Sequence, residues 1–220
     1  MKVLKKESSK LASSSFELYR RRLNWRLVTQ PKIKNKFQEI AESARNTKYP
    51  FNMFCRVHDE TVNEATVQLS SGANKTGVIE KIDTPEKKGS TCEAEKGSAL
   101  VASFSSTGSV AFIIYPYKSE RYARNEDSII LYIALSPDDV SDRVIEKCIC
   151  KYLFYNRNSS IYGVYSNSFM DNIKINWMTF VDVRNKKKLY KGFWVLFVGW
   201  SKIVGAGIAG YIVAVITQTP

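Results

Sequence analysis

The chain has 220 residues, which is enough for one hydrophobic core or for one core with an appendage. Its net charge of +12 is unevenly distributed: residues 1–50 carry +9, residues 51–182 carry −3 and residues 183–220 carry +6. A nucleic-acid-binding face is expected on the folded body, so this distribution makes nucleic acid an unlikely partner. The N-terminal segment has no apolar stretch of the ~7–15 residues that a secretory signal needs, which predicts a body that stays in the cytoplasm.

Two short helices are predicted before the central domain. Apolar residues recur at three- and four-residue steps from Ala12 to Val28, beside four arginines, and again from Ile33 to Ala44. Gln30-Pro31 is expected to break the helical run between them.

The central region predicts mainly β structure. Segments 64–70 and 76–82 are short β-prone pieces, whereas 83–98 is charged and aperiodic and is expected to be an exposed loop. Two apolar runs within 99–117 flank a Ser- and Gly-containing connection typical of a hairpin. The run at 128–135 predicts a further strand buried on both faces.

A helix should follow Ser136-Pro137-Asp138-Asp139, which offers a capping hydroxyl, a proline for the first turn and two acids near the positive end of the dipole. Ile149 of this helix is expected to face the sheet. An Asn- and Ser-rich loop is predicted over 156–171, followed by a half-exposed strand at 173–183, where apolar and polar residues alternate. Because strands cluster, the pattern favours an α+β fold with an antiparallel sheet and helices packed on one side.

The segment 192–217 has the composition of a transmembrane helix. Phe193–Ile216 would be about 36 Å long as a helix, against about 30 Å of hydrocarbon, and its few polar groups leave no face for water. Cationic residues precede it and none follow, which places the body in the cytoplasm. The arrangement resembles the topology of tail-anchored membrane proteins, a class that implies no activity.

Several residues of this span are predicted to contact lipid or a second helix: Trp194, Trp200, Lys202, Gly205, Ala209 and Gly210. Lys202 either snorkels toward the cytoplasmic headgroups or faces a partner helix or a wet path. Small residues at four-residue spacing predict close helix contact, and hence a homo-oligomer formed through the span.

Basic residues on both sides of the central domain are candidates for contact with an anionic membrane surface: Arg20, Arg21, Arg22, Arg26, Lys186, Lys187, Lys188 and Lys191. The alternative for the helix over residues 12–28 is that it packs on the domain with its arginines in solvent. The sequence leaves both possibilities open.

No catalytic motif, metal-binding cluster or cofactor fingerprint is recognisable. His58 is the only histidine, and Cys148 and Cys150 would point to different faces of a helix, so neither a zinc site nor a cofactor is expected. Cys55 and Cys92 are also expected to be free thiols.

The sequence therefore predicts a non-enzymatic, single-pass membrane protein whose cytoplasmic domain binds a ligand or a protein partner. A sensor, or an effector of toxin or defence type that oligomerises through its span, is one specific form of this hypothesis. The alternative is a membrane-tethered enzyme or nucleic-acid-binding module with its site in 49–183. The predicted organisation is a basic helical region (1–48), an α+β domain (49–183), a basic juxtamembrane segment (184–191) and the span (192–217).

Overall fold

The computed structural model describes residues 2–61, 64–84, 87–119 and 124–184. The chain divides into two units, residues 1–179 and 180–220, and nearly all of the second unit lies outside the described residues. The helical segments are α1 (Lys2–Asn24), η1 (Trp25–Thr29), α2 (Gln30–Asn46), η2 (Pro137–Asp139), α3 (Asp142–Ser159), η3 (Ile161–Gly163) and α4 (Phe169–Phe180). The strands are β1 (Met53–Thr61), β2 (Glu64–Ser71), β3 (Asn74–Thr84), β4 (Lys87–Glu95), β5 (Ala99–Phe104), β6 (Val110–Tyr115) and β7 (Ile129–Ala134).

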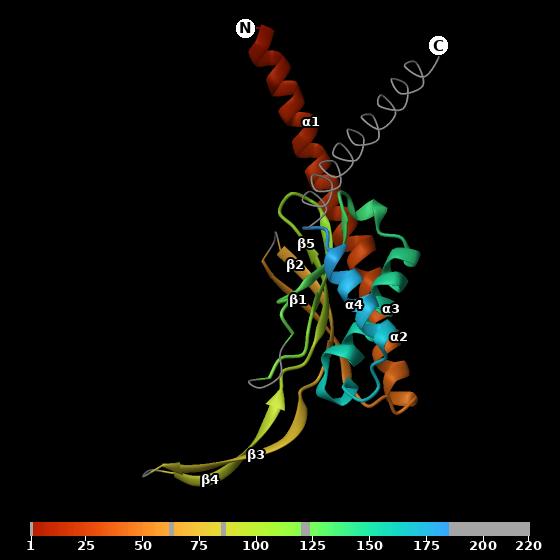
Figure 1. Cartoon of the computed structure of the whole chain (residues 1–220). Helices are drawn as coiled ribbons and strands as arrows, with labels where there is room; N and C mark the ends of the chain where they lie inside the picture. Colours follow the sequence, from red (N-terminus) through yellow and green to blue (C-terminus); the bar gives the residue numbers. More distant parts are fainter. Residues whose placement is uncertain (1, 62–63, 85–86, 120–123, 185–220) are drawn as a thin grey trace, which may run out of the picture. The chain divides into compact units, whose positions relative to one another are not determined.

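Five strands form one antiparallel sheet in the order β1-β2-β5-β6-β7, and β3 and β4 form a separate two-stranded ribbon. Helices α2, α3 and α4 cover one face of the five-stranded sheet (Figure 1). The predicted α+β class, with an antiparallel sheet and N-terminal helices, is confirmed.

The core lies between this sheet face and the helices. Alternate residues of β5 and β6 point into it, since Leu100, Ala102 and Phe112 are fully buried, whereas Val101 and Ile113 are only partly covered. Helix α2 contributes Ile33, Phe37 and Ala41 to the core, at four-residue spacing. Helix α3 contributes Ile145, Cys148, Ile149 and Tyr152, which are three or four residues apart, and α4 contributes the buried Ile175. The prediction that Ile149 faces the sheet is therefore confirmed.

The predicted break at Gln30-Pro31 is wrong, because the chain stays helical from α1 into α2. Residues Trp25–Thr29 adopt a π-helical turn, in which the Gln30 N–H donates to the Trp25 carbonyl. A proline inside an α-helix loses one backbone hydrogen bond and collides with the carbonyl four residues back. The wider π turn just before Pro31 relieves that conflict without ending the helix.

The expected loop at 83–98 is wrong for most of its length, because β4 pairs with β3 from Thr84↔Lys87 to Asn74↔Glu95. Backbone hydrogen bonds form regardless of side-chain polarity, and a ribbon outside the main core needs no apolar alternation. The β7 prediction holds for the strand but not for its burial. It is an edge strand, and Ile133 is 40% exposed.

The predicted helix start at Ser136 is only partly correct. Ser136 makes a capping box with Asp139, but the box closes the short η2 turn, and α3 begins later, after Ser141. The loop expected at 156–171 is shorter than predicted, because α3 continues through Ser159 and buries Asn156 and Asn158.

The strand predicted at 173–183 is wrong, because α4 covers most of it. Ile175 is buried, whereas Ile173 and Trp177, which should share its strand face, are 44% and 63% exposed. Ser168 and Asp171 start the helix reciprocally: the Asp171 N–H donates to the Ser168 hydroxyl and the Ser168 N–H donates to the Asp171 carboxylate.

No helix among the described residues is long and apolar enough to cross a bilayer. The predicted span at 192–217 and the juxtamembrane residues after Arg184 lie outside the described residues, so both stay predictions.

Candidate functional site

Helix α1 carries an apolar stripe that the rest of the described chain leaves uncovered. We define this stripe by its large members: Leu4, Leu11, Phe16, Tyr19 and Leu23. They fall within an arc of roughly 140° at 3.6 residues per turn. Phe16 and Tyr19 are 69% and 60% exposed, and α1 contains no buried residue. A stripe of this kind normally faces a core, so its exposure marks a contact surface.

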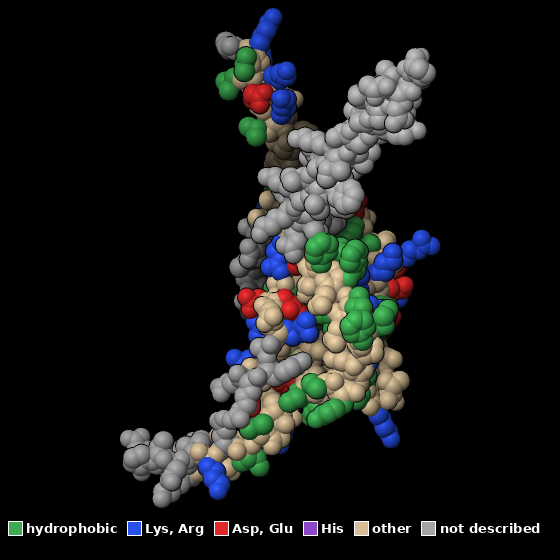
Figure 2. All heavy atoms as spheres, in the orientation of Figure 1, with side chains coloured by type: hydrophobic (Ala, Val, Ile, Leu, Met, Phe, Trp, Pro, Cys, Tyr) green, Lys and Arg blue, Asp and Glu red, His purple; other side chains and the backbone are tan. Residues whose placement is uncertain are grey.

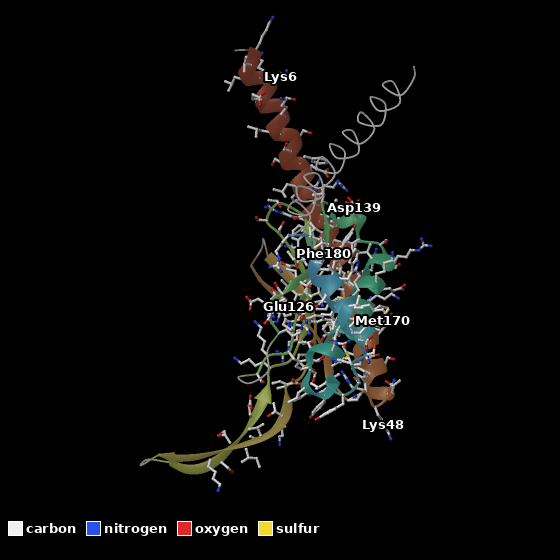
Figure 3. The ribbon with its side chains drawn as sticks, viewed as in Figure 1. Lys6, Lys48, Glu126, Asp139, Met170 and Phe180 are labelled. Atoms are coloured by element: carbon white, nitrogen blue, oxygen red, sulfur yellow. The ribbon has the colours of Figure 1, made fainter. Side chains whose placement is uncertain are left out.

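The same helix is strongly basic. Residues 2–24 hold seven Lys and Arg against two acids, Glu7 and Glu17. Lys6 lies near the N-terminal end of α1 (Figure 3). An exposed apolar stripe on a cationic helix fits a partner that is apolar and negatively charged.

The C-terminal end of α1 is held on the domain by a different face. Trp25 is 3% exposed and stacks on Phe104 of β5 at a centroid distance of 5.2 Å. Arg21 lies against the β5–β6 turn, where a Cβ at Gly108 would fall 2.9 Å from the Arg21 Cδ. Gly108 has φ +83°, so glycine is favoured there for both its backbone and its lack of a side chain.

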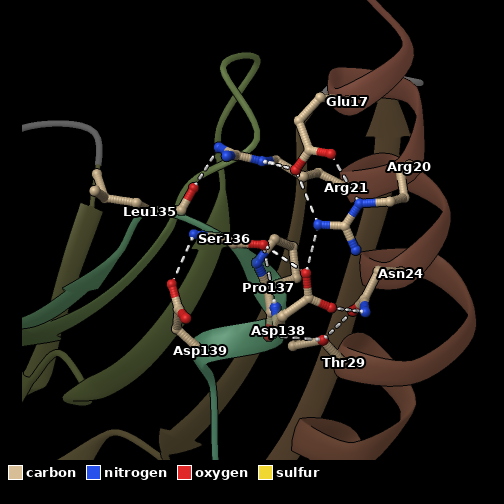
Figure 4. A network of polar contacts seen from close by, with 10 residues as sticks. All are labelled: Glu17, Arg20, Arg21, Asn24, Thr29, Leu135, Ser136, Pro137, Asp138 and Asp139. Carbon is tan, nitrogen blue, oxygen red and sulfur yellow. Dashed lines mark hydrogen bonds and ion pairs between the residues drawn. The ribbon is translucent and has the colours of Figure 1, made fainter. Parts of the chain in front are cut away.

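A polar network fixes this end of the helix to the η2 turn (Figure 4). Arg20 donates to both Glu17 oxygens at 2.9 Å and to the Asp138 carboxylate at 2.7 Å. Arg21 donates to the carbonyl of Leu135 at 2.7 Å, and Asn24 donates to Asp138. The bidentate Arg20–Glu17 pair lies within α1 and holds the guanidinium in place. The bonds of Arg20, Arg21 and Asn24 to Leu135 and Asp138 are the ones that attach this end of α1 to the domain.

The network continues into the π turn. The Thr29 hydroxyl lies 2.8 Å from the Asn24 side-chain oxygen and 3.3 Å from the carbonyl of Pro137. Lys32 donates to the carbonyl of Val140 at 3.2 Å. The two N-terminal helices are thus joined to the loop before α3 by polar contacts as well as by packing.

These contacts lower the pKa values of two acids in the network. Hydrogen bonds from Arg20 and then Arg21 lower the pKa of Glu17 from 4.5 to about 2, and a hydrogen bond from Arg20 lowers the pKa of Asp138. A carboxyl with a lowered folded-state pKa contributes stability that is present above its unfolded pKa and is lost as the pH falls through its folded pKa.

We therefore expect the last turns of α1 to lose stability between about pH 4.5 and pH 2, because the pairs of Glu17 with Arg20 and Arg21 lie within this helix. Glu17→Gln should remove much of this acid dependence while changing the fold little, because glutamine keeps the shape of the side chain and Glu17 is only partly buried. Proteolysis between α1 and the domain, followed against pH, measures the effect. A wild-type protein and a Glu17→Gln variant with the same acid profile would contradict it.

The predicted membrane-surface arginines fall into two groups. Arg20 and Arg21 are engaged in the contacts just described, whereas Arg26 is exposed and Arg22 is half-buried, with one bond of 3.5 Å to the carbonyl of Ser106. A membrane role for all four stays a prediction, but the structure gives Arg20 and Arg21 a role inside the fold. Sequence periodicity identified the stripe from Phe16 to Leu23 but not Leu4 and Leu11, because the predicted helix began at Ala12 and α1 begins at Lys2. It carried no signal for these long-range pairs.

The remaining predicted positions lie outside the described residues. They are the span residues Trp194, Trp200, Lys202, Gly205, Ala209 and Gly210, and the basic residues Lys186, Lys187, Lys188 and Lys191.

A buried polar cluster joins α3 to the sheet. The Tyr152 hydroxyl lies 3.0 Å from the Ser71 hydroxyl and donates to the carbonyl of Ser98 at 3.3 Å, and both serine hydroxyls donate to the Asn156 side chain. Burial raises the pKa of Tyr152 to about 12, so the phenol stays neutral. These four residues are almost completely buried, which gives the cluster a structural role and no access for a substrate.

Glu95 is a second buried polar centre and was not singled out by sequence reasoning. It is 1% exposed and accepts hydrogen bonds from the Asn74 amide at 2.9 Å, from the Ser160 hydroxyl and from the Ile161 N–H at 3.0 Å. The carboxylate thereby ties the base of the β3–β4 ribbon to the loop after α3.

Among the described residues no group of three or more His, Cys, Asp or Glu side chains could hold a metal ion. His58 is exposed on β1, and the cysteines are free thiols. Cys148 is buried, which raises its pKa to about 12 and makes its thiol unreactive, whereas Cys150 is exposed.

Two surface hollows are large enough to accept a small ligand. One of about 510 Å³ lies beside β4 and is lined by the cations Lys96 and Lys118, of which Lys118 pairs with Asp127 at 2.6 Å. The other, of about 430 Å³, is an apolar groove between α3 and α4.

Fold and surface together define an α+β protein that presents a basic amphipathic helix to its surroundings. No family model matches the chain, and neither a curated protein nor a solved structure shows significant similarity to it.

Proposed function

We propose that this is a non-enzymatic membrane-associated protein, anchored through residues 192–217, whose α1 helix lies on an anionic bilayer surface. The observation that carries the proposal is the exposed apolar stripe of α1 on a helix rich in cations. Its attachment to the domain uses another face, so the stripe is available for an outside partner.

Two physical terms favour lipid as that partner. An interfacial helix buries its apolar face at the boundary between headgroups and acyl chains, and each basic residue near an anionic leaflet contributes about 1 kcal/mol. A second copy of α1 would bring like charges together, which disfavours helix pairing. An anionic lipid surface would both bury the apolar stripe and attract the basic residues.

The span supports the same location. Its length and apolar composition suit a bilayer, and the basic residues at 184–191 would lie at the same anionic leaflet as α1. Self-association of the span through Gly205 and Ala209, or through Gly210, is part of the proposal. It would let the cytoplasmic domains cluster as a sensor or an effector does.

We expect two charge substitutions in the stripe, Phe16→Glu and Tyr19→Glu, to detach α1 from lipid. Both side chains are more than half exposed, so the fold should be retained. Protection of α1 from protease in vesicles containing phosphatidylserine measures the contact, and the variant should be cleaved at least about tenfold faster, as two charges in an apolar interface require.

The control places two glutamates on the exposed ribbon strand β3, as Lys75→Glu and Ile79→Glu, where Ile79 is 68% exposed. This variant should keep the wild-type protection of α1. Equal cleavage of α1 with and without vesicles in the wild type would refute the lipid contact, and a concentration-dependent dimer through α1 would replace it.

A further inference from the structure

We infer that α4 forms a second lipid contact, which lays the domain on the anionic bilayer that α1 approaches. The inference deepens the proposed function and rests on it, because the same membrane is the partner. It concerns a surface that neither the span nor α1 includes.

The surface is an apolar stripe on one side of α4, defined by Phe169, Met170, Ile173 and Trp177. The four residues fall within an arc of roughly 100°. Phe169 is 79% and Trp177 63% exposed, while Ile175, on the opposite side of the helix, is 1% exposed and belongs to the core. Helix α4 therefore has two apolar faces, one that packs on the core and one that is exposed.

Figure 2 shows hydrophobic side chains gathered on the face that carries α4, with cations beside them. The groove of about 430 Å³ between α3 and α4 is bounded by Phe154, Ile173 and Trp177, and by the cations Lys151 and Lys174. The Lys174 ammonium lies 5.8 Å from the centre of the Phe154 ring. Two lysines flank an apolar floor, with no acid among the groove residues.

This combination selects an anionic amphiphile. Tryptophan and lysine are the side chains that favour the membrane interface, where the ring reaches the acyl boundary and the ammonium remains among the headgroups. A second copy of this surface would oppose lysine to lysine and is electrostatically disfavoured.

Chain connectivity agrees with this partner. Eleven residues lie between Phe180, the last residue of α4, and Gly192 at the start of the predicted span, and a fully extended chain over these twelve Cα steps reaches only about 40 Å. A domain tethered so closely meets the bilayer surface at high effective concentration, so a weak interfacial contact is sufficient.

The test uses the full chain in vesicles and two of its own thiols. A fluorophore is placed on Cys150, which borders the groove, in a chain with Cys55→Ser and Cys92→Ser. The comparison chain carries it on the exposed Cys92 of β4, with Cys55→Ser and Cys150→Ser. Nitroxide lipids quench a fluorophore that lies at the headgroup level.

We expect the Cys150 label to be quenched strongly in vesicles containing phosphatidylserine, and several-fold less in phosphatidylcholine alone or at high salt. The Cys92 label should show little quenching. Lys151→Glu with Lys174→Glu should reduce quenching at Cys150 about tenfold, since two cations are reversed at the anionic surface. Lys75→Glu with Lys81→Glu, an equal change of charge on β3, should leave it unchanged.

Equal quenching of the two labels in a chain that stays in the bilayer would overturn this inference and leave the anchor intact. A chain washed from the vesicles by carbonate would instead refute the anchor, and quenching recorded before the wash would still decide the α4 contact. A Cys150 label that ignores lipid and responds to an acidic amphipathic peptide would assign the surface to a protein partner and overturn the lipid contact.

Discussion

Trp25→Ala is expected to lower the free energy of unfolding by about 3–5 kcal/mol, the range for truncating a buried large aromatic side chain. Trp25 is 3% exposed and stacks on Phe104 at 5.2 Å with an interplanar angle of 12°. It is the apolar link between the π turn and the sheet. Its loss leaves a cavity that two long helices and a strand cannot easily close.

Urea denaturation of the full chain, followed by circular dichroism, measures this effect. Leu27→Ala is the matched control, because Leu27 lies two residues away in the same π turn and is 68% exposed. That variant should change stability by no more than about 0.5 kcal/mol. Similar losses for the two variants would contradict the placement of Trp25 in the core.

Glu95→Ala should be the most damaging polar substitution, with an expected loss of about 2–5 kcal/mol. It leaves the buried Asn74 amide and Ser160 hydroxyl and the partly buried Ile161 N–H without their acceptor, and each buried orphaned donor costs about 1–3 kcal/mol. Removing a buried carboxylate saves its desolvation cost, which offsets part of the loss.

Glu95→Gln separates these two contributions. Glutamine keeps one acceptor oxygen and the shape of the side chain, so it should cost clearly less than alanine. Thermal unfolding of both variants measures the difference. If alanine were tolerated as well as glutamine, the hydrogen bonds at Glu95 would not hold the ribbon base to the loop after α3.

The apolar runs were sufficient to predict the central strands. Residues 99–117 and 128–135 form β5, β6 and β7, because continuous β-prone segments separated by a Ser- and Gly-containing turn leave the backbone few alternatives. The burial of β7 could not be predicted in the same way. Its position at the sheet edge depends on which strands pair, and that is a long-range property.

Helix α4 shows where local patterns conflict. The spacing of Ile173, Ile175 and Trp177 fits a strand. The exposed residues Phe169, Ile173 and Trp177, however, repeat at the four-residue interval of a helix. The capping pair Ser168 and Asp171 was the local signal that could have decided for the helix. In β4 no side-chain signal existed, because strand pairing there relies on backbone hydrogen bonds.

The candidate site was only partly predictable. The part of the stripe from Phe16 to Leu23 follows from the helical period, and the basic composition can be read from the sequence. Leu4 and Leu11 precede the predicted helix. The side of the helix that attaches to the domain does not, because Arg20 meets Asp138 across 118 residues of sequence. Such pairs form only once η2 and α1 have been brought together by the fold.

Membrane retention of the full chain tests the central claim most directly. Membranes bearing the wild-type chain are washed with alkaline carbonate, which releases adsorbed proteins and leaves inserted helices, and the same is done with a chain lacking residues 192–217. We expect the wild type to stay in the pellet, because about twenty apolar residues outweigh the insertion cost of Lys202. The deletion variant should be released by the wash. Recovery of the intact chain in the soluble fraction would contradict the account.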